Sequence, residues 1–143
     1  MRIRKLNHSV YQIQYHIVFR TKYRRKILKP YVKVELIKSF YRIQKRHPDW
    51  YFHAINTDED HVHMQIEFPP SYTIAQVVQE LKAVSAQDLR KRFNFLNKVY
   101  YGFSGVWSPG YFVSTIGLDE AKIRKYIEMQ GDDVGVDVSS EFS

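Results

Sequence analysis

The eight residues from His61 to Phe68 alternate strictly between polar and apolar side chains. Successive side chains of a β-strand point to opposite faces, so this alternation predicts a strand with one buried face and one open face. Such half-buried strands are typical of antiparallel sheets that helices cover on a single side. The two faces would carry Val62, Met64, Ile66 and Phe68 on the buried side, and His61, His63, Gln65 and Glu67 on the open side.

The remaining apolar residues recur with strand or helix spacing in an order that predicts one fold. The order is β-α-β-β-α-β with one further helix, which is the ferredoxin-like arrangement of an α+β domain, with an antiparallel sheet and its helices on one face. Asp119 is expected to cap the last helix and Gly131 to end it. The predicted elements cover residues 11–21, 30–46, 50–57, 61–68, 73–93, 111–116 and 120–130.

The stretch between the second helix and Pro109 is expected to be a loop, because Gly102 and Gly105 interrupt it.

Helical spacing also predicts which residues are buried. The first helix is expected to bury Val34, Ile37, Phe40, Tyr41 and Ile43, and the second Ile74, Val77, Val78, Leu81, Val84 and Leu89.

Length and composition indicate one globular domain over residues 1–143, with an acidic and loosely held tail from about residue 132. Apolar residues make up 44% of the chain and charged residues 26%, which is unlike a disordered protein. We expect no transmembrane helix and no signal peptide, because no apolar stretch is long enough. The chain has no cysteine, which excludes disulfides and thiolate metal sites and is consistent with a cytoplasmic protein.

The charge balance favours a polyanionic partner. Lys and Arg number 22 against 15 Asp and Glu, which gives a net charge of +7. Aromatic residues, at 15% of the chain, often lie beside the basic ones, as in proteins that bind phosphates while stacking on unpaired bases. Solvated surface charges and core rings are the alternative for any single residue. The candidate phosphate contacts are Lys22, Tyr23, Arg24, Arg25, Arg90, Lys91 and Arg92.

Two imidazoles at positions i and i+2 of a strand lie side by side, so His61 and His63 could share one metal ion. Two surface histidines on a polar strand face are the alternative. Tyr126 and Gln130 are four residues apart on the last predicted helix, so they lie one turn from each other on one face. An amide oxygen suits Mg²⁺ or Mn²⁺, and two histidines with one glutamine leave positions open for phosphate oxygens. A half-buried ring on an amphipathic helix is the alternative for Tyr126.

Several segments together resemble the single-tyrosine HUH transposases of bacterial and archaeal insertion sequences. In this family two histidines flank a hydrophobic residue, here His61, Val62 and His63. The resemblance extends in the right order over most of the chain, through the segments YHIVFRTKYRRKIL, DHVHMQI, LKAVSAQDLRKRF, VWSPGYFVST and KYIEMQ. The chain departs from the family before the histidine strand, where relatives often have Met-Pro-Asp and this chain has Thr57 to Asp60.

The resemblance implies a role for each matching residue. Tyr126 would be the nucleophile that cleaves and rejoins single-stranded DNA through a 5′-phosphotyrosine intermediate, and His61, His63 and Gln130 would hold Mg²⁺ or Mn²⁺. Lys122, one turn before Tyr126, is a candidate for assisting its deprotonation, and a solvated lysine is the alternative. The resemblance further implies a homodimer that acts on hairpin ends of a mobile element, with the tyrosine helix able to complete the partner's site.

Three other functions fit parts of the sequence. A non-catalytic module that binds single-stranded nucleic acid would use aromatic residues on the open sheet face, where this chain places His, Gln and Glu. A metal-dependent hydrolase of small phosphoesters would turn over without a covalent adduct. A domesticated relative would act on host repeat sequences. His16, on the polar face of the first strand, is a candidate for contact with the substrate or for a structural role.

Overall fold

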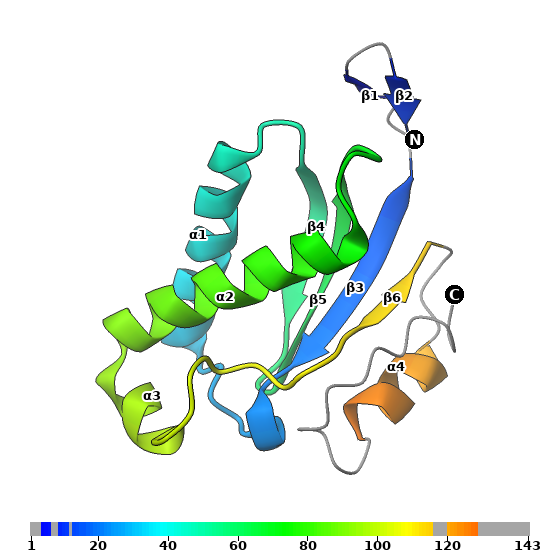
Figure 1. Ribbon diagram of the computed structural model, residues 1–143. Coiled ribbons are helices and arrows are strands. Elements are labelled where there is room, and N and C mark those ends of the chain that lie inside the picture. The colour runs from blue at the N-terminus through cyan, green and yellow to red at the C-terminus, as the bar shows by residue number, and fades with distance from the viewer. Residues whose placement is uncertain (1–3, 7–8, 12, 116–119, 129–143) are drawn as a thin grey trace.

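A four-stranded antiparallel sheet forms the centre of the protein (Figure 1). The computed structural model describes residues 4–6, 9–11, 13–115 and 120–128. Every neighbouring pair of strands is antiparallel, which confirms the predicted ferredoxin-like order. In spatial order the strands are β4 (Tyr51–Thr57), β5 (His61–Glu67), β3 (Gln14–Arg20) and β6 (Phe112–Ser114).

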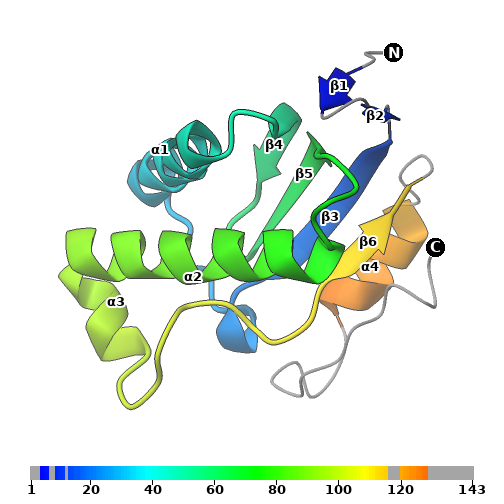
Figure 2. The same ribbon diagram turned by 45° about the horizontal axis from the view of Figure 1, so that its top comes forward.

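Two long helices, α1 (Pro30–Arg46) and α2 (Ile74–Arg92), cover one face of the sheet. Pro30 opens α1, where its missing N–H leaves no bond unmade. Thr73 caps α2 through a reciprocal pair of hydrogen bonds with Gln76. Figure 2 shows α2 and the short helix α4 (Glu120–Ile127) on opposite sides of the β6 edge of the sheet.

The core lies between the sheet and the two long helices. Strand β3 contributes Ile17 and Phe19 to it, and β5 contributes the apolar side of its alternation, as predicted. Burying this apolar surface is the main force that fixes the helices on that face. The fully buried side chains of this layer include Phe40, Leu36, Ile43, Val62, Met64, Ile66, Val77, Leu81 and Leu89.

The register between β3 and β5 decides which side chains meet on the other face. Arg20 is opposite His61, and Val18 is opposite His63. Side chains that are directly opposite in an antiparallel pair point to the same face. The two histidines therefore share the open face with Arg20 and Val18.

The buried stripe of α1 differs from the predicted one. Val34 and Tyr41 are 53% and 45% exposed, and Ile37 is only partly buried. Phe40 and Ile43 are buried as predicted, and the buried line also includes Val32, Leu36 and Ser39. Ser39 donates a hydrogen bond of 2.7 Å to Asp88 of α2, so a polar contact between the helices lies within the buried stripe.

The predicted first strand is two separate elements. Strand β2 (Ser9–Tyr11) pairs with β1 (Arg4–Leu6) in a small hairpin, and only residues from Gln14 onward join the main sheet. Ile13, expected on the apolar face, is 51% exposed between them. The prediction of one strand from Tyr11 was therefore wrong at its beginning.

The loop expected after α2 contains a short helix, α3 (Asn94–Val99). Strand β6 is shorter than the predicted strand, whose last residue, Ile116, lies outside the described residues. Asp119, Gln130, Gly131 and the acidic tail also lie outside them. Within the described ranges, no helix has the length and apolar character needed to cross a bilayer.

Candidate functional site

The first histidine of β5 is held by its neighbour in sequence. The Nδ1 atom of His61 lies 2.8 Å from Oδ1 of Asp60. A carboxylate in this position accepts the Nδ1 proton, which leaves the Nε2 lone pair for a metal ion and fixes the plane of the ring. The same Asp60 lies 4.0 Å from the Nε atom of Arg24, so this turn also contacts the basic loop after β3.

The second histidine has a polar neighbour from the adjacent strand. The Nε2 atom of His63 lies 3.3 Å from the side-chain nitrogen of Asn56, its partner on β4. His16 lies diagonally across on β3, where its pKa is lowered, first by burial and then by the charge of His63. The polar face is thus lined with imidazoles from two adjacent strands.

Tyr126 lies on the same side of the sheet as these histidines. Arg20, the partner of His61 across the β3–β5 ladder, places its guanidinium carbon 4.7 Å from the centre of the Tyr126 ring. Its Nη1 atom donates a hydrogen bond to the backbone oxygen of Tyr126. Arg20, which holds the tyrosine helix, is therefore the direct neighbour of His61 on the adjacent strand.

The Tyr126 ring belongs to a small apolar cluster distinct from the main core. Its centre is 6.5 Å from that of Phe112 on β6, which is opposite Val18 in the β3–β6 register. All three side chains are buried, and Tyr126 is only 1% exposed. This cluster fastens α4 over the open face, so the ring is buried by the helix that carries it and by the sheet edge beneath.

Two imidazoles on this face are potential ligands for one divalent metal ion. His61 and His63 lie two residues apart on one strand face, and the carboxylate of Asp60 orients the first ring. Gln130, the third expected ligand, lies outside the described residues. No cluster of three or more His, Asp and Glu side chains with metal-binding geometry occurs in the described part of the chain. A complete site would therefore need an amide or substrate oxygen besides the two imidazoles.

The first predicted basic cluster forms a single turn, η1 (Lys22–Arg24), directly after β3. Tyr23 and Arg24 have φ angles of 60° and 53°, in the left-handed region that non-glycine residues rarely adopt. Lys22 and Arg25 both place their charged groups over the exposed Tyr23 ring. These candidate contacts are therefore gathered on one surface at the histidine end of the sheet.

The second basic cluster lies elsewhere and is divided. Arg90 donates hydrogen bonds to the backbone oxygens of Phe103 and Gly105 and to the side chain of Asn97, which gives it a structural role. Arg92 lies 3.8 Å from Glu35 of α1. Arg90 therefore holds the loop whose Phe103 ring contacts Tyr23 of η1, whereas Arg92 pairs with α1. Contact of Arg90, Lys91 and Arg92 with DNA stays a prediction.

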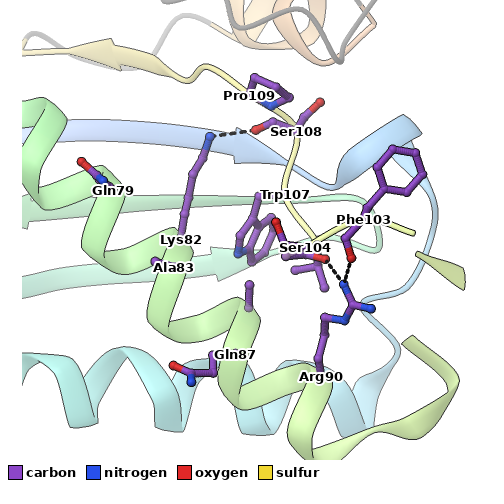
Figure 3. Close-up of a pocket in the computed structure, with 13 residues that line it drawn as sticks. Gln79, Lys82, Ala83, Gln87, Arg90, Phe103, Ser104, Trp107, Ser108 and Pro109 are labelled. Carbon is purple, nitrogen blue, oxygen red and sulfur yellow. Dashed lines mark hydrogen bonds between the residues drawn. The ribbon is translucent and has the colours of Figure 1, made fainter. Parts of the chain in front are cut away.

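A groove of about 780 Å³ lies between α2 and residues 103–109 (Figure 3). Lys82 projects from α2 along this groove and donates hydrogen bonds of 2.8 and 2.6 Å to the backbone oxygens of Ser108 and Gly110. Burial, and secondarily the charge of Arg20, lowers the pKa of Lys82 to about 8. Since Lys82 also lies over the Phe19 ring of the core layer, the groove is on the helix side of the sheet, away from the histidines.

Sequence reasoning missed Arg20, which links the tyrosine helix to the histidine strand. Its place on the polar side of β3 is readable from the alternation, but its position opposite His61 depends on the register.

Comparison with known proteins gives a consistent result. The family model described as IS200-like transposase matches residues 9–130. The transposase for insertion sequence element IS200 from Salmonella typhimurium is 33% identical over 130 residues, covering 89% of this chain and 82% of the relative. The ISDra2 transposase TnpA from Deinococcus radiodurans is 30% identical over 124 residues, covering 86% and 87%.

The fold agrees with this relationship. A Deinococcus radiodurans protein whose crystal structure is described as that of a putative transposase superposes with a TM-score of 0.76 and 29% identity, covering 87% of this chain and 95% of that one. The sequence match extends from β2 across the histidine strand and α4 to residue 130. The chain therefore belongs to the family of IS200-like transposases.

Proposed function

We propose that this transposase cleaves and rejoins single-stranded DNA, with Tyr126 as a covalent nucleophile and a divalent metal ion held by His61, His63 and Gln130. The observation that carries the proposal is the Arg20 contact: the residue that holds Tyr126 is the cross-strand partner of His61. A nucleophile and a metal site on one face of one sheet are the arrangement that phosphoryl transfer requires.

In the cleavage step the phenolic oxygen of Tyr126 forms a bond to phosphorus while the bond from phosphorus to the 3′ oxygen breaks. The phenol loses its proton and the departing 3′ oxygen gains one, so no net proton is consumed. The products are a 5′-phosphotyrosine and a free 3′-hydroxyl. In the rejoining step another 3′-hydroxyl attacks the same phosphorus and Tyr126 leaves. The covalent link conserves the energy of the phosphodiester, so no nucleotide cofactor is required.

His61, His63 and Gln130 would hold Mg²⁺ or Mn²⁺. Bound there, the cation supplies a Lewis acid that withdraws charge from a non-bridging oxygen of the phosphodiester. Asp60 keeps the His61 ring in the tautomer that leaves Nε2 able to bind a metal ion. In this proposal Asp60 acts through His61, by positioning one metal ligand.

The burial of Tyr126 sets a further requirement. At 1% exposure its ring cannot reach a phosphodiester while α4 lies as described. Helix α4 spans only eight residues and contacts the sheet at its β3 and β6 edge. A shift of α4 relative to Arg20 would expose the phenol without disturbing the core between the sheet and α1 and α2.

Transposition joins two DNA ends, and each chain supplies one candidate tyrosine. Two copies of the site are therefore needed, and a homodimer with two-fold symmetry supplies them. We propose a dimer that binds hairpin ends of a mobile element, in which a displaced α4 can serve the partner's histidines. Mixing Tyr126→Phe chains with His63→Ala chains should then restore cleavage in heterodimers. Well-formed heterodimers that remain inactive would contradict assembly across the dimer.

The chemistry is tested with single-stranded DNA that contains the junction of the chain's own element, labelled at one end at a time. With Mg²⁺ or Mn²⁺, the label at the 3′ end should migrate with the protein on a denaturing gel. The label at the 5′ end should leave on a shorter strand with a 3′-hydroxyl. Cleavage with continuing turnover and no adduct would instead indicate a hydrolase, and binding without cleavage would indicate a non-catalytic module.

A further inference from the structure

Two exposed rings lie against each other at the histidine end of the sheet. Tyr23 of η1 and Phe103 of the loop before β6 are 46% and 44% exposed. Their centres are 5.9 Å apart and their planes are inclined at 71°. Exposed aromatic rings that lie together can form part of a binding surface, and the surroundings of this pair favour such a role.

The backbone is arranged to present the Tyr23 ring. Tyr23 and Arg24 both adopt left-handed φ angles, a conformation that costs energy for residues with side chains. Strain of this kind persists where the surrounding structure enforces it, and it gathers at sites that bind ligands. The loop that carries Phe103 turns sharply before and after this residue, at Gly102 and Gly105, whose φ angles are 85° and 78°.

Hydrogen bonds join the two loops into one unit. The buried Tyr100 donates its hydroxyl to the backbone oxygen of Lys22 at 2.9 Å, and the Lys22 amide donates to Val106 at 2.9 Å. Arg90 of α2 donates to the backbone oxygen of Phe103, as Figure 3 shows. The backbone segments that carry the two rings are therefore fixed relative to each other before any ligand arrives, which lowers the entropy that binding must overcome.

Positive charge surrounds the rings. The Lys22 ammonium lies 4.8 Å from the centre of the Phe103 ring and 5.4 Å from that of Tyr23, and the Arg25 guanidinium lies 5.7 Å from the latter. Flat rings with flanking cations match the two parts of an unpaired nucleotide, since a base offers a π face and the backbone offers phosphates.

The position of this surface relates it to the histidines. η1 begins two residues after Arg20, the partner of His61, and the Thr21 amide donates to the backbone oxygen of Asp60 at 2.9 Å. A strand of DNA that passes over the two rings would thus continue toward the turn that orients His61.

We propose that Tyr23 and Phe103 form a stacking site for one unpaired base of the DNA strand, and that Lys22 and Arg25 bind the phosphates beside it. This site deepens the proposed function and rests on it, because single-stranded DNA is the ligand. The assignment goes beyond a general basic surface, because it requires a base at one position of the strand and a ring at residue 103.

The test measures binding of the full chain to a fluorescent single strand containing the element junction, without added metal. A single abasic site is moved along this strand, which removes one base and leaves every phosphate. At one position, loss of the base should weaken binding to wild-type protein by about tenfold, the range of one base–aromatic stack. Phe103→Ala should weaken binding to the intact strand by a similar factor. The abasic site at that position should then have no further effect on the variant.

Two variants make the result specific. Phe103→Trp should restore binding, because it restores a flat ring. Tyr41→Ala is a matched control: Tyr41 is 45% exposed and lies edge-on to Phe52 at 5.6 Å, but it belongs to α1. It should bind like the wild type.

The proposal is overturned if Phe103→Ala binds the intact strand as tightly as the wild type. It is also overturned if the abasic site weakens binding to the wild type and to Phe103→Ala equally. Adduct formation by wild-type protein on the same strand is scored separately. Base-dependent binding without an adduct would support the stacking site while contradicting covalent chemistry at Tyr126.

Discussion

Arg20 contacts Tyr126 in two ways: its guanidinium lies 4.7 Å from the ring centre, and its Nη1 atom donates to the backbone oxygen. The backbone oxygens in the last turn of a helix lack partners within the helix, and a cation there is favourable. Arg20 is buried and faces His61 across the strand ladder. Arg20 therefore links the tyrosine helix directly to the histidine strand, in addition to the apolar contact between Tyr126 and Phe112.

Replacing Arg20 should loosen α4 selectively. In Arg20→Ala the helix loses a charged hydrogen bond and a ring contact, and we expect the free energy of unfolding to fall by about 2 kcal/mol. Amide exchange over residues 120–128, followed by mass spectrometry, should accelerate, while exchange in α1 should change little. Arg42→Ala is the matched control, since Arg42 pairs with Asp88 on the surface at 3.2 Å. Unchanged exchange over α4 would show that Arg20 does not hold the helix.

Removing one oxygen should separate chemistry from binding. Tyr126→Phe keeps the ring that packs against Arg20 and Phe112, so the fold and the affinity for single-stranded DNA should remain within about twofold of wild type. The covalent adduct should disappear, because no nucleophile remains at this position. The measurement is a denaturing gel for the adduct beside an anisotropy titration. If Tyr126→Phe still formed an adduct, the nucleophile would have to be another residue.

The strands of the sheet could be predicted because their alternation is local. In β5 each apolar residue faces the helices, as the sequence indicates, and the pairing of His61 with His63 on one face follows directly. The hairpin of β1 and β2 was missed, because strands of three residues are too short to show a period. Helix α3 was missed for a similar reason, with glycines following within a few residues.

Packing between elements was harder to predict. On α1, residues 34, 37 and 41 form one apolar line and residues 32, 36, 40 and 43 form another, and only tertiary contact selects the second. The bond from Ser39 to Asp88 lies in that second line, where a hydropathy pattern shows a polar residue. In the candidate site the histidines could be located from the sequence, whereas the Arg20 contact depends on register and on the docking of α4.

The carboxylate beside His61 should control metal affinity. In Asp60→Asn an amide replaces the oxygen that lies 2.8 Å from Nδ1 of His61, so the preferred tautomer and ring orientation are no longer enforced. We expect the affinity for Mn²⁺ to fall by roughly 10- to 100-fold, the usual effect of removing such a partner. Electron paramagnetic resonance of free Mn²⁺ during a titration measures this directly.

Asp58→Asn is the control for that experiment. Asp58 lies in the same turn and loses the same charge, but its carboxylate accepts from the Glu59 amide at 2.8 Å and orients no histidine. Equal losses of affinity in the two variants would mean that the general charge of the turn attracts the cation. A loss confined to Asp60→Asn would assign the effect to orientation of His61.

Lys82 should make stability depend on pH in a defined window. Its pKa falls from 10.5 to about 8 in the folded protein, first because it is buried and then because of Arg20. Between these two values the unfolded chain retains a proton that the folded chain has lost. The free energy of unfolding therefore rises with pH across this window, relative to a chain without the lysine. Below pH 8 both states are protonated and the difference is constant.

Urea unfolding of wild type and Lys82→Met, compared below pH 8 and between pH 8 and 10.5, measures this effect. Lys82→Met should be less stable at every pH, because the backbone oxygens of Ser108 and Gly110 lose their donor. The difference in free energy of unfolding between the two proteins should widen as pH rises through the window. Only folded wild type gains stability there, because Lys82 loses its proton and no longer buries a charge. Lys91 is exposed on the same helix. The free energy of unfolding of Lys91→Met should therefore differ from that of wild type by the same amount at every pH. A gap for Lys82→Met that narrows with rising pH would mean that folding favours the charged amine, and that its two hydrogen bonds outweigh its burial.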